Sequence, residues 1–130
     1  MVDAITDRAE IFATLRGELE RFVPPLEARS TVEGKDDYQL WSAKPVERDG
    51  RKYEETYFAG VIAQKGYVGF YYMPVYAEPE LRELFAPELL ALLKGKSCFH
   101  VRRLDDEVLA QIRRALDAGF ALYRERGWVD

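Results

Sequence analysis

Apolar and polar positions at the start of the chain repeat with a helical period. From Asp3 to Val23, apolar residues recur every three or four positions, which is the stripe of an amphipathic helix. Two consecutive prolines, Pro24 and Pro25, cannot continue a helix and end it. The pattern predicts one helix whose core stripe consists of Ile5, Ala9, Phe12, Leu15, Leu19 and Phe22.

The period then changes to that of β-strands. Three stretches are rich in aromatic and β-branched residues: Tyr38–Ser42, Glu55–Gln64 and Tyr67–Met73. Asp49-Gly50 separates the first two, and Lys65-Gly66 separates the last two. Because such pairs supply the positive φ of tight hairpins, we predict a three-stranded antiparallel meander.

The second half of the chain predicts short helices, a fourth strand and a long final helix. In order, these are a short helix opened by Glu78-Pro79, a second over Pro87–Lys94, a strand over Cys98–Arg103 and a helix over Asp105–Arg126. Gly95 and Gly127 follow two of the helices, as is typical of helix ends. Asp105 is a suitable N-cap for the last helix.

This order of elements predicts an α+β fold in a single domain over residues 1–130. Its antiparallel four-stranded sheet is the three-strand meander plus the later strand, packed with N-terminal, middle and C-terminal helices. Gly119 falls in the apolar stripe of the last helix, where a glycine costs about 1 kcal/mol relative to alanine. We interpret it as a point of close approach between helix and sheet.

Both faces of the predicted sheet are apolar. Alternation assigns to the main core face Phe58, Ile62, Val68, Phe70, Tyr72, Phe99 and Val101. It assigns to the opposite face Tyr57, Val61, Tyr67, Tyr71, Met73, Cys98 and His100. A small sheet with two apolar faces must be covered twice, so the second face is expected to meet further helices, a partner subunit in a homodimer or a ligand.

Composition and charge narrow the class of protein. Of 130 residues, 48% are hydrophobic and 32% charged, and 19 basic against 23 acidic side chains give a net charge of -4. This balance supports a folded core and offers no electrostatic footprint for nucleic acid. No apolar run approaches the roughly 20 residues of a membrane span, so we expect no membrane contact and a cytoplasmic location. The one cysteine, Cys98, excludes an intrachain disulfide.

Three blocks of residues in the second half form a recognisable set. They are Gly66–Leu81 (GYVGFYYMPVYAEPEL), Leu92–Asp105 (LLKGKSCFHVRRLD) and Ala118–Trp128 (AGFALYRERGW). With these blocks the chain resembles the YdhG-like family of bacterial domains of unknown function, over roughly Tyr57–Trp128. The resemblance implies a small α+β fold. It also implies one candidate activity, because some members of the family are described as frataxin-like intracellular iron chaperones.

Cys98 and His100 are the most reactive pair in the sequence. They are two residues apart on a predicted strand, so they share a face at a backbone distance of roughly 6 to 7 Å. A thiol and an imidazole can act as nucleophile and base or bind a metal. No spacing supplies a group that would orient His100, so an enzyme that uses the pair is the third hypothesis. The interpretation of Cys98 that we prefer is a small, partly buried apolar residue.

A set of carboxylates on the first helix motivates the second hypothesis. Asp3, Asp7, Glu10 and Glu18 lie opposite the apolar stripe, and hard cations prefer carboxylate oxygens. A frataxin-like chaperone would bind iron weakly there, with Asp3, Asp7 and Glu10 as candidate ligands. The alternative is an ordinary solvated helix face. We expect no other cofactor, and no tightly bound zinc, because one Cys and one His leave a tetrahedral site incomplete.

The first hypothesis is a non-catalytic binding or interaction module that uses the second sheet face. Tyrosine hydroxyls and an imidazole among apolar walls are the few polar groups expected of a ligand site. Its partner would be a small molecule or another protein. The candidate ligand-binding residues are Tyr57, Tyr71, Lys96, Cys98, His100 and Arg102. Lys94-Gly95-Lys96-Ser97 does not add a phosphate-binding loop, since position 90 is Leu and a strand follows.

Overall fold

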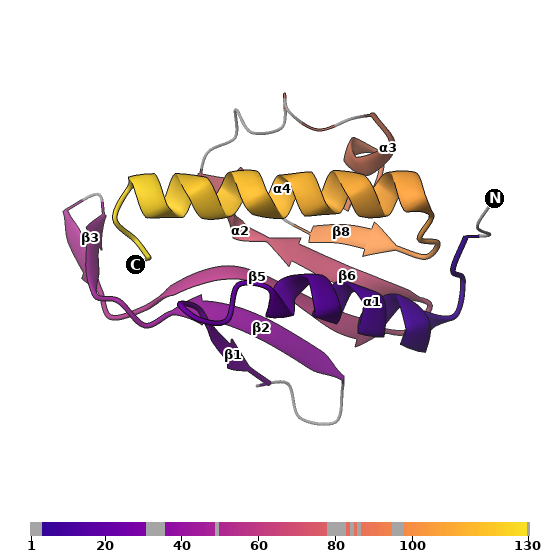
Figure 1. Cartoon of the computed structure of the whole chain (residues 1–130), viewed down its shortest axis with the longest axis horizontal. Coiled ribbons are helices and arrows are strands. Elements are labelled where there is room, and N and C mark those ends of the chain that lie inside the picture. The colour runs from indigo at the N-terminus through magenta and orange to yellow at the C-terminus, as the bar shows by residue number, and fades with distance from the viewer. Residues whose placement is uncertain are drawn as a thin grey trace.

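An antiparallel sheet is the framework on which the helices pack. The computed structural model describes residues 4–30, 36–48, 50–77, 83, 85, 87–94 and 98–129. Within them the sheet has six strands in the order β1-β2-β5-β6-β8-β7, all antiparallel to their neighbours (Figure 1). The strands are β1 (Glu27–Arg29), β2 (Asp37–Ser42), β5 (Thr56–Gln64), β6 (Tyr67–Tyr72), β8 (Cys98–Val101) and β7 (Leu93–Lys94). The α+β class and the antiparallel sheet are confirmed, but the sheet has six strands rather than the predicted four.

The two additional strands are the short ones at the sheet edges. β1 has three residues and pairs with β2, and β7 has two and pairs with β8. β7 lies where the sequence predicts a helix over Pro87–Lys94, and the helix there, α3, covers only Pro87–Leu90. Stretches this short carry no readable periodicity. Gly95, the predicted end of that helix, lies outside the described residues.

A second, two-stranded sheet corrects the predicted hairpin between the first two long strands. β3 (Val46–Arg48) pairs with β4 (Arg51–Tyr53). Gly50, with φ of +78°, turns the tip of this small hairpin instead of joining β2 directly to β5. Asp49 lies outside the described residues. Gly66, with φ of +86°, does form the predicted turn between β5 and β6.

The long helices begin at aspartate caps. The Asp105 carboxylate accepts a hydrogen bond from the Val108 amide at 2.8 Å, as predicted, and α4 covers Asp106–Glu125. α1 covers Arg8–Glu20 and begins after Asp7, so it is shorter than the predicted 3–23. Ile5 is not part of its apolar stripe, because it forms an isolated β-bridge with Leu104.

Two predicted boundaries in the middle of the chain also change. The strand predicted over Tyr67–Met73 ends at Tyr72, because Met73 is the first residue of α2 (Met73–Ala77). The helix predicted to open at Glu78-Pro79 falls mostly outside the described residues.

All four described helices lie on one side of the six-stranded sheet. α1 buries Ile11, Leu15 and Leu19 in the core, and α4 buries Ile112, Leu116 and Tyr123. α2 and α3 pack against α4: Pro74 lies beside Gly119, and the Leu89 amide donates to the Gln111 side chain at 3.1 Å. Figure 1 shows α1 and α4 crossing the same face of the sheet. We call this covered side the core face.

A β-bulge in β5 changes the expected alternation. Leu40 pairs with Ala59, and the next residue, Trp41, pairs with Tyr57, so Phe58 is an extra residue in β5. Phe58 still packs on the core face, against Phe120 and Tyr123. After the bulge Val61 is fully buried in the core, and Ile62 takes the opposite face. The predicted core position of Ile62 and the predicted outer position of Val61 are therefore wrong.

Gly119 lies where α4 approaches the sheet closely, as the sequence predicts. A Cβ at this position would lie 2.8 Å from Pro74 Cγ and 2.9 Å from Tyr72 Cζ, closer than real Cβ contacts allow. The Tyr72 hydroxyl donates a short hydrogen bond to the Ala115 carbonyl, one turn earlier in α4. The glycine thus lets a sheet tyrosine reach the helix backbone.

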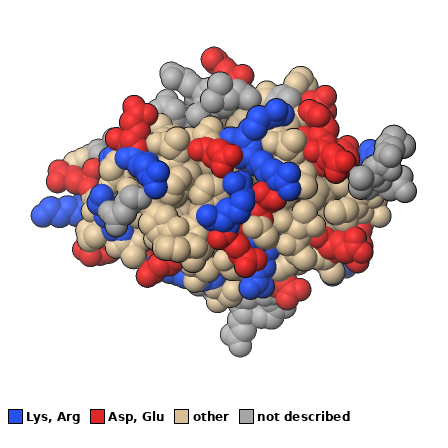
Figure 2. All heavy atoms as spheres, in the orientation of Figure 1, with Lys and Arg blue, Asp and Glu red and all other residues tan. Residues whose placement is uncertain are grey.

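The outer surfaces of α1 and α4 carry acidic and basic side chains that form ion pairs with one another. Glu18 is largely buried and accepts hydrogen bonds from Arg21 at 3.1 Å and Arg113 at 2.8 Å, which ties α1 to α4. Figure 2 shows acidic and basic side chains interspersed over this face. Among the described helices, none is both long enough and apolar enough to span a membrane.

Candidate binding face of the sheet

The strand register assembles a set of ring-bearing side chains on the side of the sheet away from the helices. Tyr71 pairs with Cys98, Gly69 pairs with His100, and Gly60 pairs with Tyr71. Residues paired across strands point the same way, so the register brings side chains from β2, β5, β6 and β8 together. We call this the aromatic face and define it by Trp41, Tyr57, Tyr67, Tyr71, Cys98 and His100, all of which are half-buried.

Two glycines make room for the tyrosines. The Tyr57 hydroxyl lies directly against Gly60 in its own strand. In β6, a Cβ on Gly69 would lie 2.9 Å from Cε2 and 3.3 Å from Cζ of Tyr71. Both tyrosines therefore lean along their strands over a glycine instead of standing upright, and the face is low in relief. A side chain at either glycine would displace a ring.

Ring contacts connect the strands. Tyr67 and His100 stack with centroids 4.1 Å apart and planes 17° from parallel, and the Arg102 guanidinium lies 5.4 Å from the Tyr67 centroid. On the other half, Trp41 and Tyr57 meet at 5.1 Å with a 58° tilt. These distances are those of favourable aromatic and cation–π pairs. The rings thus support one another in place without a helix above them.

Polar side chains between the rings are bonded within the face. Trp41 Nε1 donates to Gln39 Oε1 at 3.1 Å, and Gln39 Nε2 donates to Asp37 Oδ2 at 2.9 Å. Gln64 Nε2 donates to the Tyr71 hydroxyl at 3.5 Å. Asp37 and Gln39 are buried. The amide and carboxylate groups are therefore satisfied inside the face, which reduces the cost of leaving it without a helical cover.

Burial raises the pKa of three side chains of the face. It raises the pKa of Tyr57 well above the ordinary tyrosine value, and it also raises the pKa of Tyr71. Burial raises the pKa of the Cys98 thiol too, although the Tyr71 hydroxyl beside it acts in the opposite direction. A thiol with a raised pKa contains little thiolate, which is the nucleophilic form. His100 stacks on Tyr67, and no hydrogen bond joins it to Cys98 among the described contacts. The hypothesis that the protein is an enzyme using Cys98 and His100 therefore gains no support.

Charge is divided unevenly over the two halves of the face. The β6–β8–β7 half carries two positive charges. Lys94 of β7 pairs with Cys98, and Arg102 follows the end of β8 and lies over the Tyr67 ring. The β1–β2–β5 half carries Asp37 and Arg29, and Arg29 is paired with Glu27 at 2.9 Å and Glu55 at 2.5 Å. One half of the face is therefore basic, and the other is mixed with an acidic excess.

The structure places most of the sequence-predicted ligand residues together. Tyr57, Tyr71, Cys98 and His100 share one face, and Arg102 lies at its margin; a role in binding remains a prediction. Lys96 lies outside the described residues. Tyr67 was expected on this face but was not among the predicted ligand residues, and Trp41 was not assigned to either face. Trp41 follows Leu40, which is buried in the core, and the alternation in Tyr38–Ser42 is the signal that could have placed it on the second face.

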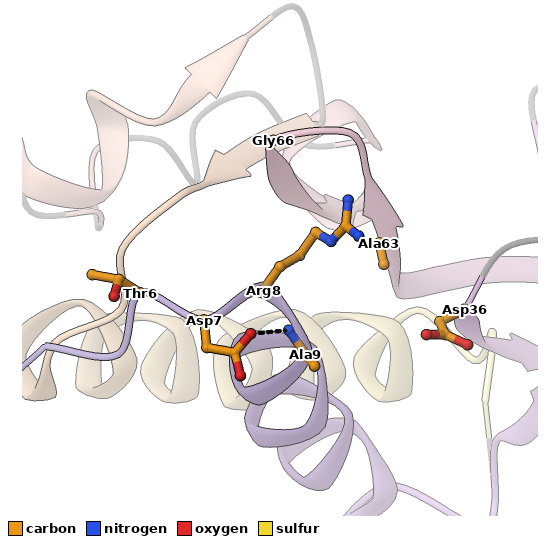
Figure 3. Close-up of a pocket in the computed structure, with 7 residues that line it drawn as sticks. All are labelled: Thr6, Asp7, Arg8, Ala9, Asp36, Ala63 and Gly66. Atoms are coloured by element: carbon orange, nitrogen blue, oxygen red, sulfur yellow. Dashed lines mark hydrogen bonds between the residues drawn. The ribbon is translucent and has the colours of Figure 1, made fainter.

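The start of α1 contributes a separate hollow of about 430 Å³ (Figure 3). Asp7 and Asp36 line it together with Arg8, whose Nη1 donates to the Gln64 carbonyl at 2.6 Å. Asp7 also accepts from the Ala9 amide at 3.2 Å and so serves as the helix cap. The two carboxylates would repel a bound anion. The arginine and the positive end of the helix dipole would repel a bound cation. The hollow therefore fits neither kind of ion well.

The predicted iron ligands are not assembled in the part of the chain that can be described. Asp7 is the α1 cap, Glu10 is exposed, and Asp3 lies outside the described residues. Glu18, which the helical pattern placed with them, is instead paired with Arg21 and Arg113. Within the described residues, no three His, Cys, Asp or Glu side chains come together as a metal site would require. The iron-chaperone alternative stays a prediction without structural support.

Comparison of the chain with protein-family models, curated proteins and solved structures finds no match.

Proposed function

We propose that this protein is a non-catalytic binding module that binds a small molecule carrying a flat ring on its aromatic face. One observation carries the proposal: five rings from four strands lie on the side of the sheet opposite every described helix. They belong to Trp41, Tyr57, Tyr67, Tyr71 and His100. Flat ligands stack on such rings, and phenol and imidazole groups add hydrogen bonds.

The chemistry of the face favours binding over catalysis. Burial raises the pKa of the Tyr57 and Tyr71 hydroxyls and of the Cys98 thiol, so these groups can form hydrogen bonds but are poor bases and nucleophiles. The glycines beneath Tyr57 and Tyr71 keep the surface flat. A flat ligand can therefore contact several strands at once. The resemblance to the YdhG-like family is a separate proposal that rests on sequence blocks alone.

The proposal is tested by an NMR titration with two probes of matched size. Benzyl alcohol carries a flat aromatic ring. Cyclohexylmethanol carries a saturated, puckered ring of similar size and the same hydroxymethyl group. Binding of both probes is followed at the amide signals of β5, β6 and β8. We expect the Kd of benzyl alcohol to be about twofold to tenfold lower than that of cyclohexylmethanol, as a stacking contribution of about 0.5–1.5 kcal/mol implies. Equal effects of the two probes, or shifts confined to other parts of the molecule, would contradict the proposal.

Matched variants locate the effect. Tyr67→Leu and Tyr71→Leu remove a ring from the aromatic face and are expected to weaken benzyl alcohol binding. Tyr53→Leu removes a ring from β4, in the separate hairpin, and is expected to leave binding unchanged. If all three variants weakened binding alike, the aromatic face would not be the site.

A further inference from the structure

From the charge on the aromatic face, we infer that the ligand it prefers combines a flat ring with an anionic group, and that the anion is held at Arg102. This inference rests on the proposed function and names the chemistry of its ligand. The observation behind it is the uneven division of charge between the two halves of the face.

Arg102 is the cation best placed to meet a ligand. It follows β8 directly, is exposed, and lies over the ring of Tyr67, which itself stacks on His100. Within the described contacts no carboxylate forms an ion pair with it. A guanidinium carries five N–H donors in a fork that matches carboxylate and phosphate oxygens. An anion attached to a ring on this face would find that fork beside the Tyr67–His100 stack.

Arg29 provides the contrast at the opposite end of the face. Its guanidinium lies 5.2 Å from the Trp41 ring, as Arg102 lies beside Tyr67, but it is bonded to Glu27 and Glu55. Those carboxylates already satisfy the cation and repel a second anion. Of the described arginines, Arg29 and Arg102 lie over rings of the aromatic face, and Arg102 is the one whose environment favours an anionic ligand.

The neighbouring face positions reinforce this preference. Every face position of β6, β8 and β7 is a neutral residue, a histidine or a lysine: Tyr67, Gly69, Tyr71, Cys98, His100 and Lys94. Lys94 adds a second positive charge near Cys98. Complementary charge selects between ligands of similar shape more than it raises affinity overall. We therefore expect the anionic group to set specificity and the rings to supply most of the contact.

The test uses four probes with one ring and different charge. Benzyl alcohol is neutral, phenylacetate carries a carboxylate, phenyl phosphate carries a phosphate and benzylamine carries a cation. The NMR titration is expected to give phenylacetate or phenyl phosphate about threefold to tenfold tighter binding than benzyl alcohol, with benzylamine weakest. The comparison of the two anions identifies which acceptor group, carboxylate or phosphate, the site prefers.

Three variants assign the preference to its residue. Arg102→Gln should abolish the advantage of the anionic probes over benzyl alcohol, whereas Lys94→Gln should reduce that advantage only in part. Arg103→Gln is the matched control, because Arg103 is also exposed but alternates out of phase with the face. The amide spectrum of each variant shows whether it is folded.

The outcomes separate this inference from the proposed function. If all four probes bind the face equally, or if Arg103→Gln and Arg102→Gln act alike, the inference is wrong and the proposed function stands. If no probe shifts the face, both fail. If sedimentation shows a dimer and the aromatic face is protected within it, a second copy is the occupant, and both are likewise overturned.

Discussion

The two faces of the sheet are made from alternate residues of the same strands, yet they are stabilised in different ways. On the core face, Phe70 and Phe99 are 1% and 0% exposed beneath α1 and α4. On the aromatic face, the adjacent residues Tyr71 and Cys98 are half-buried, and their described contacts are with neighbours within the sheet. The core face depends on cover from helices, whereas the aromatic face depends on lateral contacts between rings.

Tyrosine hydroxyls show the same difference. On the core face, Tyr72 donates to the Ala115 carbonyl of α4, and Tyr123 of α4 donates to the Tyr57 carbonyl at 2.8 Å. These bonds fix helix to sheet. On the aromatic face, the Tyr71 hydroxyl accepts from Gln64 and lies near Cys98, so its partners are all within the sheet. The described polar groups of this face are therefore bonded without a helix.

The largest expected effect is on the free energy of unfolding, and it differs between variants at two adjacent residues of β8. Phe99→Ala should destabilise the protein by about 3–5 kcal/mol, because it opens a cavity in the core. His100→Ala, one residue later on the aromatic face, should cost about 1 kcal/mol, mainly the stack on Tyr67. Denaturant unfolding measures both. Similar losses for the two variants would mean that the faces do not differ in the way described.

A smaller effect is expected where α4 meets the core face. Gly119→Ala places a methyl group against Tyr72 and Pro74 and should cost about 1–3 kcal/mol through overpacking. Gly17→Ala is the control, because a Cβ at Gly17 in α1 meets open space. That change should stabilise the protein by roughly 0.5–1 kcal/mol through helix propensity. A neutral Gly119→Ala variant would show that the close approach is absent.

Alkaline pH tests the buried hydroxyl of Tyr57. Because burial raises its pKa in the folded state, the folded protein keeps this proton to higher pH than the unfolded chain does. Its contribution is full below about pH 10, the unfolded tyrosine value, and is lost as pH rises above it. The free energy of unfolding of Tyr57→Phe should fall less steeply between pH 9 and 11.5. Parallel curves for the variant and the parent would refute the assignment.

The smallest effect concerns the reactivity of Cys98. Because burial raises the pKa of its thiol, iodoacetamide should alkylate Cys98 several-fold more slowly than free cysteine at pH 7.5. The rate is followed by mass spectrometry of the intact protein. Alkylation faster than that of free cysteine would indicate an activated thiol and would reopen the enzyme hypothesis.

Alternation predicted much of this fold, and irregular pairings account for what it missed. Tyr71, Cys98 and His100 were assigned to one face correctly, because β6 and β8 pair without interruption. Ile62 was assigned wrongly, since the bulge at Phe58 shifts the phase of β5 in a way no local pattern reveals. Ile5 kept a helical spacing but forms a bridge to Leu104, a contact nearly 100 residues away that only the tertiary structure determines.

The sequence indicated which residue types form the candidate site, but it did not indicate how their side chains are arranged or which arginine is paired. Tyrosines out of phase with the core indicated a second face. Alternation does not reveal that Tyr57 and Tyr71 each lean along their own strand over Gly60 and Gly69. The contrast between Arg29 and Arg102 likewise follows from tertiary ion pairs, because Glu55 reaches Arg29 from a distant part of the chain.

Exposure of ring protons to a soluble, neutral gadolinium chelate tests the central claim most directly, because it compares the two faces in one NMR experiment. The account predicts strong relaxation of the ring protons of Trp41, Tyr67 and Tyr71, and little relaxation of those of Phe58, Phe70 and Phe99. Equal protection of both sets would show that the aromatic face is covered in solution, and would contradict the claim that it is open to a ligand.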